Sequence, residues 1–495
     1  MKKCVIIGSG LGGLSCGVIL AKNGYDVTVL EQGSQIGGCL QCFQRDHTTY
    51  DTGMHYIGSA AEGQTLHTIM NYLGLNDKIS LSRLDPDGYD IISFQGGHYR
   101  YANGREQFVE ALVEQFPRSR DDLNRYFDLV KLVASSSIMH TLSKDVDINV
   151  NAQYKMTSTN EVLASIISDP LLQQVVAGMQ PLYAGVKDKT PFSVHALIHD
   201  CFNQSAFRIV GGSSQVASSL AASIQTFGGR VLPRHQASRI ECSQTCATAV
   251  ITANGERFPA DLVISAIHPA VTMQLIDSHL IRPYYRKRLE TASNTSSVFV
   301  VYLKFRKDSV RYMNHNLYYY RSDSTWGGES YDEASWPKFL LYMHFCHAAN
   351  PVFAESGKIL TYMNYSELSQ WAGTHVGRRG EDYEAFKQRK AEQMIDALEE
   401  EVPGIRSQIE SYFTATPLTY VDYTGIPEGS MYGIAKDVNA IGLKSISCRT
   451  GVPNLLLTGQ SITSHGMFGV MAGSLITCSE VLSQDQLLTQ LKQQS

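Results

Sequence analysis

The chain has 495 residues, which is enough for two domains and a large core. Its 42 Lys and Arg residues against 47 Asp and Glu residues give a formal net charge of −5, which argues against a nucleic acid as the main partner. The ten cysteines are scattered and no run of about 18 apolar residues occurs, so we expect a cytoplasmic protein without a disulfide framework or transmembrane helix, with peripheral contact at a membrane left open.

The N-terminus is predicted to form a strand, a glycine loop, a helix and a second strand. Residues 5–7 are apolar and run into residues 8–13, whose sequence Gly-Ser-Gly-Leu-Gly-Gly has the form G-x-G-x-x-G. An apolar helical pattern follows over residues 14–21, and a second apolar strand, residues 27–30, ends on Glu31. Strand, loop, helix, strand and acid in this order predict a dinucleotide site; a glycine-rich turn without a ligand is the alternative.

Each part of this unit has a physical role in holding a dinucleotide. Gly8 allows the tight turn, Gly10 lets the backbone approach a pyrophosphate, and Gly13 lets helix and strand pack closely. The N-terminus of the helix offers free N–H groups and the positive end of its dipole to the pyrophosphate. Glu31 is placed to accept hydrogen bonds from an adenosine ribose.

Two further glycine blocks narrow the dinucleotide to FAD. Gly37 and Gly38 follow the acid and let another stretch of backbone pass close to the cofactor, for which an NAD-type domain has no need. Near the C-terminus, an apolar strand leads to Gly459 and Gln460, and a helix is expected to start near Phe468. The N-terminus of that helix would place N–H groups against the pyrimidine edge of a reduced flavin.

The middle of the chain is predicted to leave the cofactor domain and to return to it. Residues 64–75 read as an amphipathic helix and residues 88–103 as a hairpin, followed by a largely helical insertion at about 104–205. The glycine pair at 211–212 opens a helix and strands that bring the chain back, with the backbone of Val231 expected near the adenine.

Two later strands, residues 297–303 and 339–345, are apolar and aromatic. Such strands are able to form the floor of a tunnel for an apolar ligand. An ordinary sheet core explains the same residues equally well, and the pattern leaves both interpretations open.

The expected fold class is α/β, with an FAD-binding Rossmann-type domain and a discontinuous mixed α+β substrate domain. The FAD-binding domain is expected to combine residues 1–103, 206–275 and 435–495. Residues 104–205 and 276–434 are expected to form the substrate-binding domain.

Two motif blocks carry a resemblance to a known flavoprotein superfamily. Residues 51–58 have the sequence Asp-Thr-Gly-Met-His-Tyr-Ile-Gly, and the C-terminal block contains Gly459 and Gln460. These blocks resemble the phytoene desaturase and carotenoid isomerase superfamily, whose fold is also amine oxidase-like. Residues 37–39 and 416–433 resemble its retinol saturase branch (all-trans-retinol 13,14-reductase-like) more closely. Because the matching motifs lie at both ends, the resemblance spans nearly the full chain.

One position departs from the pattern that the chain resembles. Many relatives carry an arginine directly after the glycine pair to meet the pyrophosphate, whereas this chain has Cys39. The phosphate charge must then be met by the helix dipole, backbone N–H groups and, as one candidate, Arg45. Cys39 and Cys42 form a C-x-x-C, for which we expect a structural role rather than a redox or metal site.

The resemblance implies an FAD-dependent oxidoreductase that acts on carbon–carbon double bonds of an apolar polyene or isoprenoid. Saturation, desaturation or isomerisation would proceed by hydride transfer at flavin N5. The partner would be an apolar small molecule. No second G-x-G-x-x-G follows a strand, so NAD(P)H, one candidate electron donor, would bind without a domain of its own; a protein carrier or a quinone is equally open.

Candidate catalytic residues are those expected beside the flavin ring. His55, Tyr56 and His465 are each able to donate a proton or a hydrogen bond, or only to pack the loops. The residues expected to contact the cofactor are Gly8, Gly10, Leu11, Gly12, Gly13, Glu31, Gln32, Gly37, Gly38, Cys39, Val231, Gly459, Gln460, Gly466, Phe468, Gly469 and Val470.

Two other functions are compatible with the expected fold. The first is a flavin amine oxidase, against which the stretch 416–433 argues because it resembles the polyene group. The second is a non-catalytic prenyl- or lipid-binding protein of the GDP-dissociation-inhibitor type, which needs no flavin. The intact phosphate loop, Glu31 and the block at 459–460 argue against this second function.

Overall fold

A five-stranded parallel sheet holds the N-terminal unit in the computed structural model, which describes residues 1–440 and 446–493. Its order is β10-β2-β1-β14-β20, so strands from three distant parts of the chain lie side by side. The strands are β1 Lys3–Ile7, β2 Asp26–Leu30, β10 Arg230–Leu232, β14 Leu262–Ser265 and β20 Leu455–Leu457. This architecture confirms the predicted α/β Rossmann-type fold.

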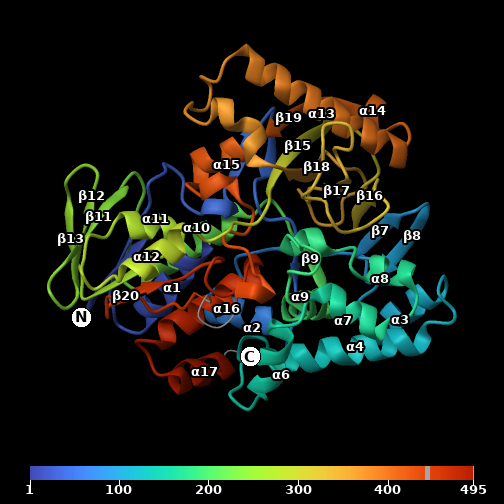
Figure 1. Cartoon of the computed structure of the whole chain (residues 1–495). Helices are drawn as coiled ribbons and strands as arrows, with labels where there is room; N and C mark the ends of the chain where they lie inside the picture. Colours follow the sequence, from blue (N-terminus) through green and yellow to red (C-terminus); the bar gives the residue numbers. More distant parts are fainter. Residues whose placement is uncertain (441–445, 494–495) are drawn as a thin grey trace.

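Three helices pack on this sheet and on one another. They are α1 Leu11–Lys22, α10 Ser214–Thr226 and α16 Gly466–Ser479. All three are rich in buried apolar residues, and α1 lies between the other two. A small antiparallel sheet of β11 Ala237–Cys242, β12 Ala247–Thr252 and β13 Arg257–Pro259 extends from the same part of the molecule (Figure 1).

A seven-stranded sheet forms the second layer, in the order β19-β15-β18-β17-β16-β7-β8. Its strands are β7 Asp90–Phe94, β8 Gly97–Tyr101, β15 Ser297–Phe305, β16 Asn316–Tyr320, β17 Phe339–His344, β18 Ser356–Met363 and β19 Ile409–Ala415. Alternate residues of β15 face opposite sides of the sheet, so Phe299 and Val301 pack against α13 (Glu381–Glu401). Val298 and Val300 face the helices of residues 105–204. Figure 1 shows α13 lying over the outer face of this sheet.

The predicted helical insertion is confirmed and faces the inner side of the seven-stranded sheet. Its helices, called the helical block below, are α3 Arg105–Val113, α4 Arg120–Ser135, α5 Ile138–Thr141, α6 Ile148–Lys155, α7 Thr159–Ile166, α8 Pro170–Val176 and α9 Phe192–Gln204. In the part of the chain that the structure describes, no helix is both long and apolar enough to cross a bilayer.

The remaining elements connect these layers. The strands are β3 Cys42–Arg45, β4 Thr48–Asp51, β5 Ile57–Gly58, β6 Leu81–Arg83 and β9 Ala206–Ile209. The helices are α2 Thr65–Tyr72, α11 Pro269–Gln274, α12 Pro283–Glu290, α14 Ile405–Gln408, α15 Pro417–Thr424 and α17 Gln484–Lys492. Short 3-10 turns are η1 Gly38–Leu40, η2 Gln180–Tyr183, η3 Tyr365–Trp371, η4 Pro427–Gly429 and η5 Val438–Ala440.

One domain boundary differs from the expectation. The hairpin at 88–103 forms as predicted, as β7 and β8, but β7 pairs in parallel with β16 from Asn316↔Asp90 to Tyr319↔Ser93. Placing residues 90–101 in the FAD-binding domain was therefore wrong, because their backbone hydrogen bonds continue the seven-stranded sheet. The other predicted domain boundaries stay a prediction.

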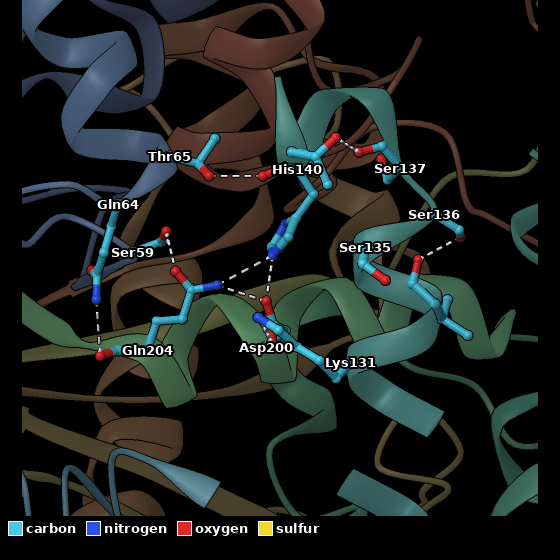
Figure 2. Close-up of polar contacts among 12 residues, drawn as sticks. Ser59, Gln64, Thr65, Lys131, Ser135, Ser136, Ser137, His140, Asp200 and Gln204 are labelled. Carbon is cyan, nitrogen blue, oxygen red and sulfur yellow. Dashed lines mark hydrogen bonds and ion pairs between the residues drawn. The ribbon is translucent and has the colours of Figure 1, made fainter. Parts of the chain in front are cut away.

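A buried carboxylate ties the helical block together behind α16. Figure 2 shows His140 from α5 and Gln204 from α9 converging on Asp200, while Lys131 reaches it from α4. His140 Nε2 lies 2.5 Å and Gln204 Nε2 2.6 Å from Asp200 Oδ2, and Lys131 Nζ lies 3.3 Å from Oδ1. The His140 ring meets the ring of Phe468, in the first turns of α16, edge to face at 5.3 Å. The cluster therefore fixes the position of the start of α16.

Asp200→Asn is expected to lower the free energy of unfolding by about 3 kcal/mol at neutral pH, because it removes the charge that its buried partners are placed to meet. Burial alone would raise the pKa of Asp200, but the hydrogen bond and charge of His140, with Lys131 and Gln204, hold this pKa below its ordinary value. A carboxyl with a lowered pKa stabilises the fold above its unfolded pKa of about 4 and loses that effect as the pH falls further. The difference between variant and wild type should therefore shrink toward about pH 3.

Denaturant unfolding at both pH values measures this effect. Lys131→Ala is the matched control, because the Lys131 side chain is 59% exposed and its removal should cost less than about 1 kcal/mol. Equal losses in the two variants would contradict the assignment of the buried carboxylate as the anchor.

Candidate functional site

A cavity of about 500 Å³ joins the two layers. One end lies at the carboxyl ends of β1 and β2, where Gly8, Gly10 and Glu31 line it. The other end reaches the inner face of the seven-stranded sheet, where Val298 and Val300 line it. A ligand pocket at the carboxyl ends of parallel strands is typical of open α/β sheets.

The first glycine loop has the shape that a diphosphate requires. Gly8 has a φ of +96°, and a Cβ placed on Gly13 would lie 2.0 Å from the Gly8 carbonyl oxygen, so both positions need glycine. Nothing lies within 4 Å of a Cβ placed on Gly10, whose open side faces the cavity. Gly10 also precedes α1 without a side-chain cap, which leaves the N-terminal N–H groups of the helix free.

The other two glycine blocks close on this loop. A Cβ on Gly38 would lie 3.3 Å from Gly10 Cα, and one on Gly12 would lie 3.1 Å from Gly459 Cα. The N-termini of α1 and α16 consequently border the same cavity, since Gly10 and Gly466 both line it. Two uncapped helix N-termini and three glycine contacts fit a dinucleotide with an anionic diphosphate and an electron-rich ring.

Glu31 lies at the end of the cavity near β1 and β2, where it would face the ribose of a bound dinucleotide, and its carboxylate already accepts three hydrogen bonds. Its Oε2 accepts from Ser9 N at 3.1 Å and from Ser9 Oγ at 2.5 Å, and its Oε1 accepts from Gly33 N at 2.7 Å. A carboxylate has about four lone-pair positions, so Glu31 retains capacity for a ribose hydroxyl.

The structure brings almost all of the predicted site residues together. Of the seventeen predicted cofactor residues, only Gly13 and Val231 do not line the cavity, and His55, Tyr56 and His465 all do. Val231 pairs with Val29 within the sheet, whereas Gln236 and Ala237, a few residues later, line the cavity. The cavity meets this part of the chain only after β10 has ended, and the expected adenine contact of Val231 stays a prediction.

No lysine or arginine is among the described residues that line the cavity. Arg45, named as a candidate for the phosphate charge, is exposed on β3 and does not line it. Burial raises the pKa of the Cys39 thiol to about 11, so this side chain is neutral. The charge of a diphosphate would therefore fall on backbone N–H groups and the dipole of α1.

Three histidines line the cavity, His55, His268 and His465, and burial lowers the pKa of each, so all three are uncharged near neutral pH. Burial, followed by the charge of Lys358, holds the pKa of His55 well below its ordinary value, and burial lowers the pKa of His465 to about 3. His465 stacks on Tyr432 with ring centroids 4.3 Å apart. A neutral imidazole is able to donate or accept a hydrogen bond but holds no extra proton to give.

Tyr56 leads to a buried acid that the sequence interpretation missed. Its hydroxyl donates to Asp90 Oδ2 at 2.7 Å and lies 2.7 Å from the hydroxyl of Tyr318. Asp90 is fully buried at the start of β7, and burial raises the pKa of its carboxyl to about 7. The available signal was one acid at the head of an apolar strand, which is otherwise an unfavourable place for a carboxylate.

Gly10→Ala is expected to leave the apoprotein fold intact and to weaken FAD binding at least tenfold. The φ of Gly10 is an ordinary −64° and the added methyl group meets no protein atom, but it points to where the diphosphate would pass. Apoprotein melting and quenching of FAD fluorescence measure the two effects.

Two glycine variants serve as controls. Gly13→Ala should lower the melting temperature, because its methyl group meets the Gly8 oxygen, while Gly373→Ala, at an open position away from the cavity, should change neither property. Wild-type FAD affinity in the Gly10→Ala protein would place the diphosphate elsewhere.

Known proteins resemble this chain in sequence and in fold. The chain is 28% identical to the all-trans-retinol 13,14-reductase of Rattus norvegicus, over 97% of this chain and 86% of that protein. It is 24% identical to a lycopene-forming phytoene desaturase of Pseudescherichia vulneris, over 98% of this chain and 100% of the relative. The crystal structure of an oxidoreductase from Methanosarcina mazei superposes with a TM-score of 0.65 at 15% identity, covering 96% of this chain and 100% of that one.

The family model described as flavin containing amine oxidoreductase matches residues 11–480. This match begins inside the first glycine loop and ends after α16, so it includes both helix N-termini that border the cavity. The chain therefore belongs to the flavin containing amine oxidoreductase family.

Proposed function

We propose that this chain is an FAD-dependent oxidoreductase that acts on carbon–carbon double bonds of an apolar polyene or isoprenoid. One observation carries the proposal: a single continuous cavity joins the glycine loops that would hold a dinucleotide to a chamber lined by apolar side chains. The chamber residues are Leu182, Leu197, Ile198, Phe202, Val298, Val300, Leu360, Tyr420, Met431 and Tyr432. The relatives named for retinol reduction and phytoene desaturation support the same reaction class.

The polarity of the chamber suits a substrate without polar groups. Among the described residues that line the cavity, Glu31 is the only carboxylate, and it lies at the dinucleotide end. Affinity for a polyene would come from burial of its chain against aliphatic and aromatic side chains, at roughly 25 cal/mol per Å² of apolar surface. The predicted tunnel floor is supported by Val298, Val300 and Leu360, which reach the cavity from β15 and β18 of the seven-stranded sheet.

The chemistry divides between cofactor and protein. Bound FAD would supply or take up a hydride at N5. The protein would align the chain between α9 and the seven-stranded sheet, exclude water with its apolar walls, and hold one proton beside the reacting carbons. NAD(P)H is our candidate electron donor, and contact with a membrane surface from the cytoplasmic side would give access to an insoluble substrate.

The amine oxidase alternative has one observation in its favour, the name of the family whose model matches. An ammonium-bearing substrate requires a carboxylate or an aromatic cage beside the flavin. The chamber has aromatic residues in Tyr420 and Tyr432 but no acid among its described lining residues. The lipid-binding alternative requires no flavin, and membership in a flavin containing family argues against it.

The proposal predicts that a polyene changes the redox state of the bound flavin. In anaerobic mixtures, a polyene should either reoxidise the reduced flavin with loss of one conjugated double bond or bleach the oxidised flavin, and visible spectra follow both partners at once. Primary amines serve as the matched substrates for the alternative. Bleaching by amines together with no response to any polyene in either redox state would refute the proposal.

A further inference from the structure

A chain of buried polar groups runs from the cavity wall into the protein interior. Tyr56 lines the cavity and its hydroxyl donates to Asp90 Oδ2 at 2.7 Å. The second carboxyl oxygen, Asp90 Oδ1, accepts from Asn316 Nδ2 at 2.7 Å. The Tyr318 hydroxyl completes the group at 2.7 Å from that of Tyr56. These contacts join three separate segments of the chain: the loop before β5, β7 and β16.

Asp90 has no ion-pair partner within 4 Å among the described residues. The nearby cation is Arg208 on β9, whose Nη2 donates to the His315 carbonyl at 2.7 Å. The other titratable groups that face the carboxyl are Tyr89 beside it in the chain, Tyr56, and Tyr318 on β16. Burial raises the pKa of Asp90 to about 7, against the opposing effects of Asn316, Tyr56 and Arg208. Both charge states are therefore accessible near neutral pH.

The charge of Asp90 decides where the hydrogen of Tyr56 points. A phenol has one hydrogen, and an ionised carboxylate only accepts, so ionised Asp90 holds that hydrogen away from the cavity. A protonated carboxyl becomes a donor to the Tyr56 oxygen. The Tyr56 hydrogen is then released from the carboxyl and is available to another acceptor.

We propose that Asp90 stores the proton used in the cavity and passes it on through Tyr56. Asp90 itself does not touch the substrate and is therefore a positioning residue. This inference rests on the proposed function and names the group that supplies the proton of the proposed reaction. In the reductive direction, one alkene carbon takes the hydride and the other takes the hydrogen of the Tyr56 hydroxyl, while the carboxyl proton of Asp90 moves to the Tyr56 oxygen. One π bond is lost, two C–H bonds form, and Asp90 is left as the carboxylate. Solvent reprotonates it between turnovers; the oxidative direction is the reverse.

The histidines that line the cavity, His55, His268 and His465, are poor sources of this proton. All three are neutral near pH 7, so none brings a proton that it is ready to lose. Of the three predicted catalytic residues, only Tyr56 is hydrogen-bonded to a group that changes charge near neutrality.

The test compares wild type with Asp90→Asn, Tyr56→Phe and Tyr320→Phe. Asparagine keeps the volume and is able to donate to Tyr56 and accept from Asn316, but it has no proton to pass on. Because burying an ionised carboxyl is unfavourable, Asp90→Asn should melt no lower than wild type at about pH 8, which verifies folding. Tyr320→Phe is the matched control. It removes a buried hydroxyl from β16, the strand that carries Tyr318, but that hydroxyl donates to the Gly178 carbonyl at 2.6 Å, away from Asp90.

Two readouts are measured from about pH 5 to pH 9. Infrared difference spectra should show a protonated carboxyl band that disappears near neutral pH and is missing in Asp90→Asn. The rate at which a polyene reoxidises the reduced flavin should fall about tenfold per pH unit above neutrality in wild type and in Tyr320→Phe. Asp90→Asn and Tyr56→Phe should react roughly 100-fold more slowly at low pH, and their rates should not fall as the pH rises above neutrality. If the reaction runs in the oxidative direction, the wild-type rate should instead fall as the pH drops below neutrality.

The outcomes separate this inference from the function on which it rests. If polyenes change the wild-type flavin but Asp90→Asn retains the wild-type rate and pH profile, or if no titrating carboxyl band is lost in the variant, the reservoir is refuted and the function stands. If no polyene changes the wild-type flavin at any pH, the proposed function fails and the reservoir fails with it.

Discussion

The close contact of two glycine loops is the constraint on which the rest of the structure depends. Gly12, after β1, and Gly459, after β20, approach so closely that a Cβ on the first would lie 3.1 Å from the Cα of the second. This contact joins segments almost 450 residues apart and brings the N-termini of α1 and α16 to one cavity. The described lining has no lysine or arginine, so the N-termini of α1 and α16 are the groups that would attract an anionic cofactor. The contact between Gly12 and Gly459 holds these two N-termini at the cavity.

The chemistry available in the cavity follows from the low polarity of its surroundings. Burial keeps His55 and His465 neutral and raises the pKa of Cys39 and of Asp90, the latter to about 7. The apolar chamber would therefore suit hydride transfer together with the buried proton source that we propose, and among the described residues its lining offers no charged side chain for binding an ionic substrate. These properties match a reaction at an unactivated double bond better than oxidation of an amine.

Local features could be predicted from the sequence, and features that depend on distant pairing could not. The β1–α1–β2 unit and Glu31 were accessible because turn glycines, strand pattern and acid lie within about thirty residues. The hairpin β7–β8 was also predictable from local pattern. Its domain was not, because β7 pairs with β16, more than 200 residues later in the chain. The pattern also located β10 without showing that the cavity meets the chain after it, at Gln236 and Ala237. The link between Tyr56, Asp90 and Tyr318 spans three segments, and only folding brings them together.

The most direct test of the central claim is the mass and double-bond geometry of a polyene recovered after a single anaerobic turnover in D2O, once with reduced and once with oxidised flavoprotein. Our account predicts that one of the two mixtures yields a product altered by two hydrogens across one carbon–carbon bond, in a stoichiometric amount with the flavin. If both mixtures return the polyene unchanged while a primary amine is oxidised by the same preparation, the cavity serves amine chemistry and the account is wrong.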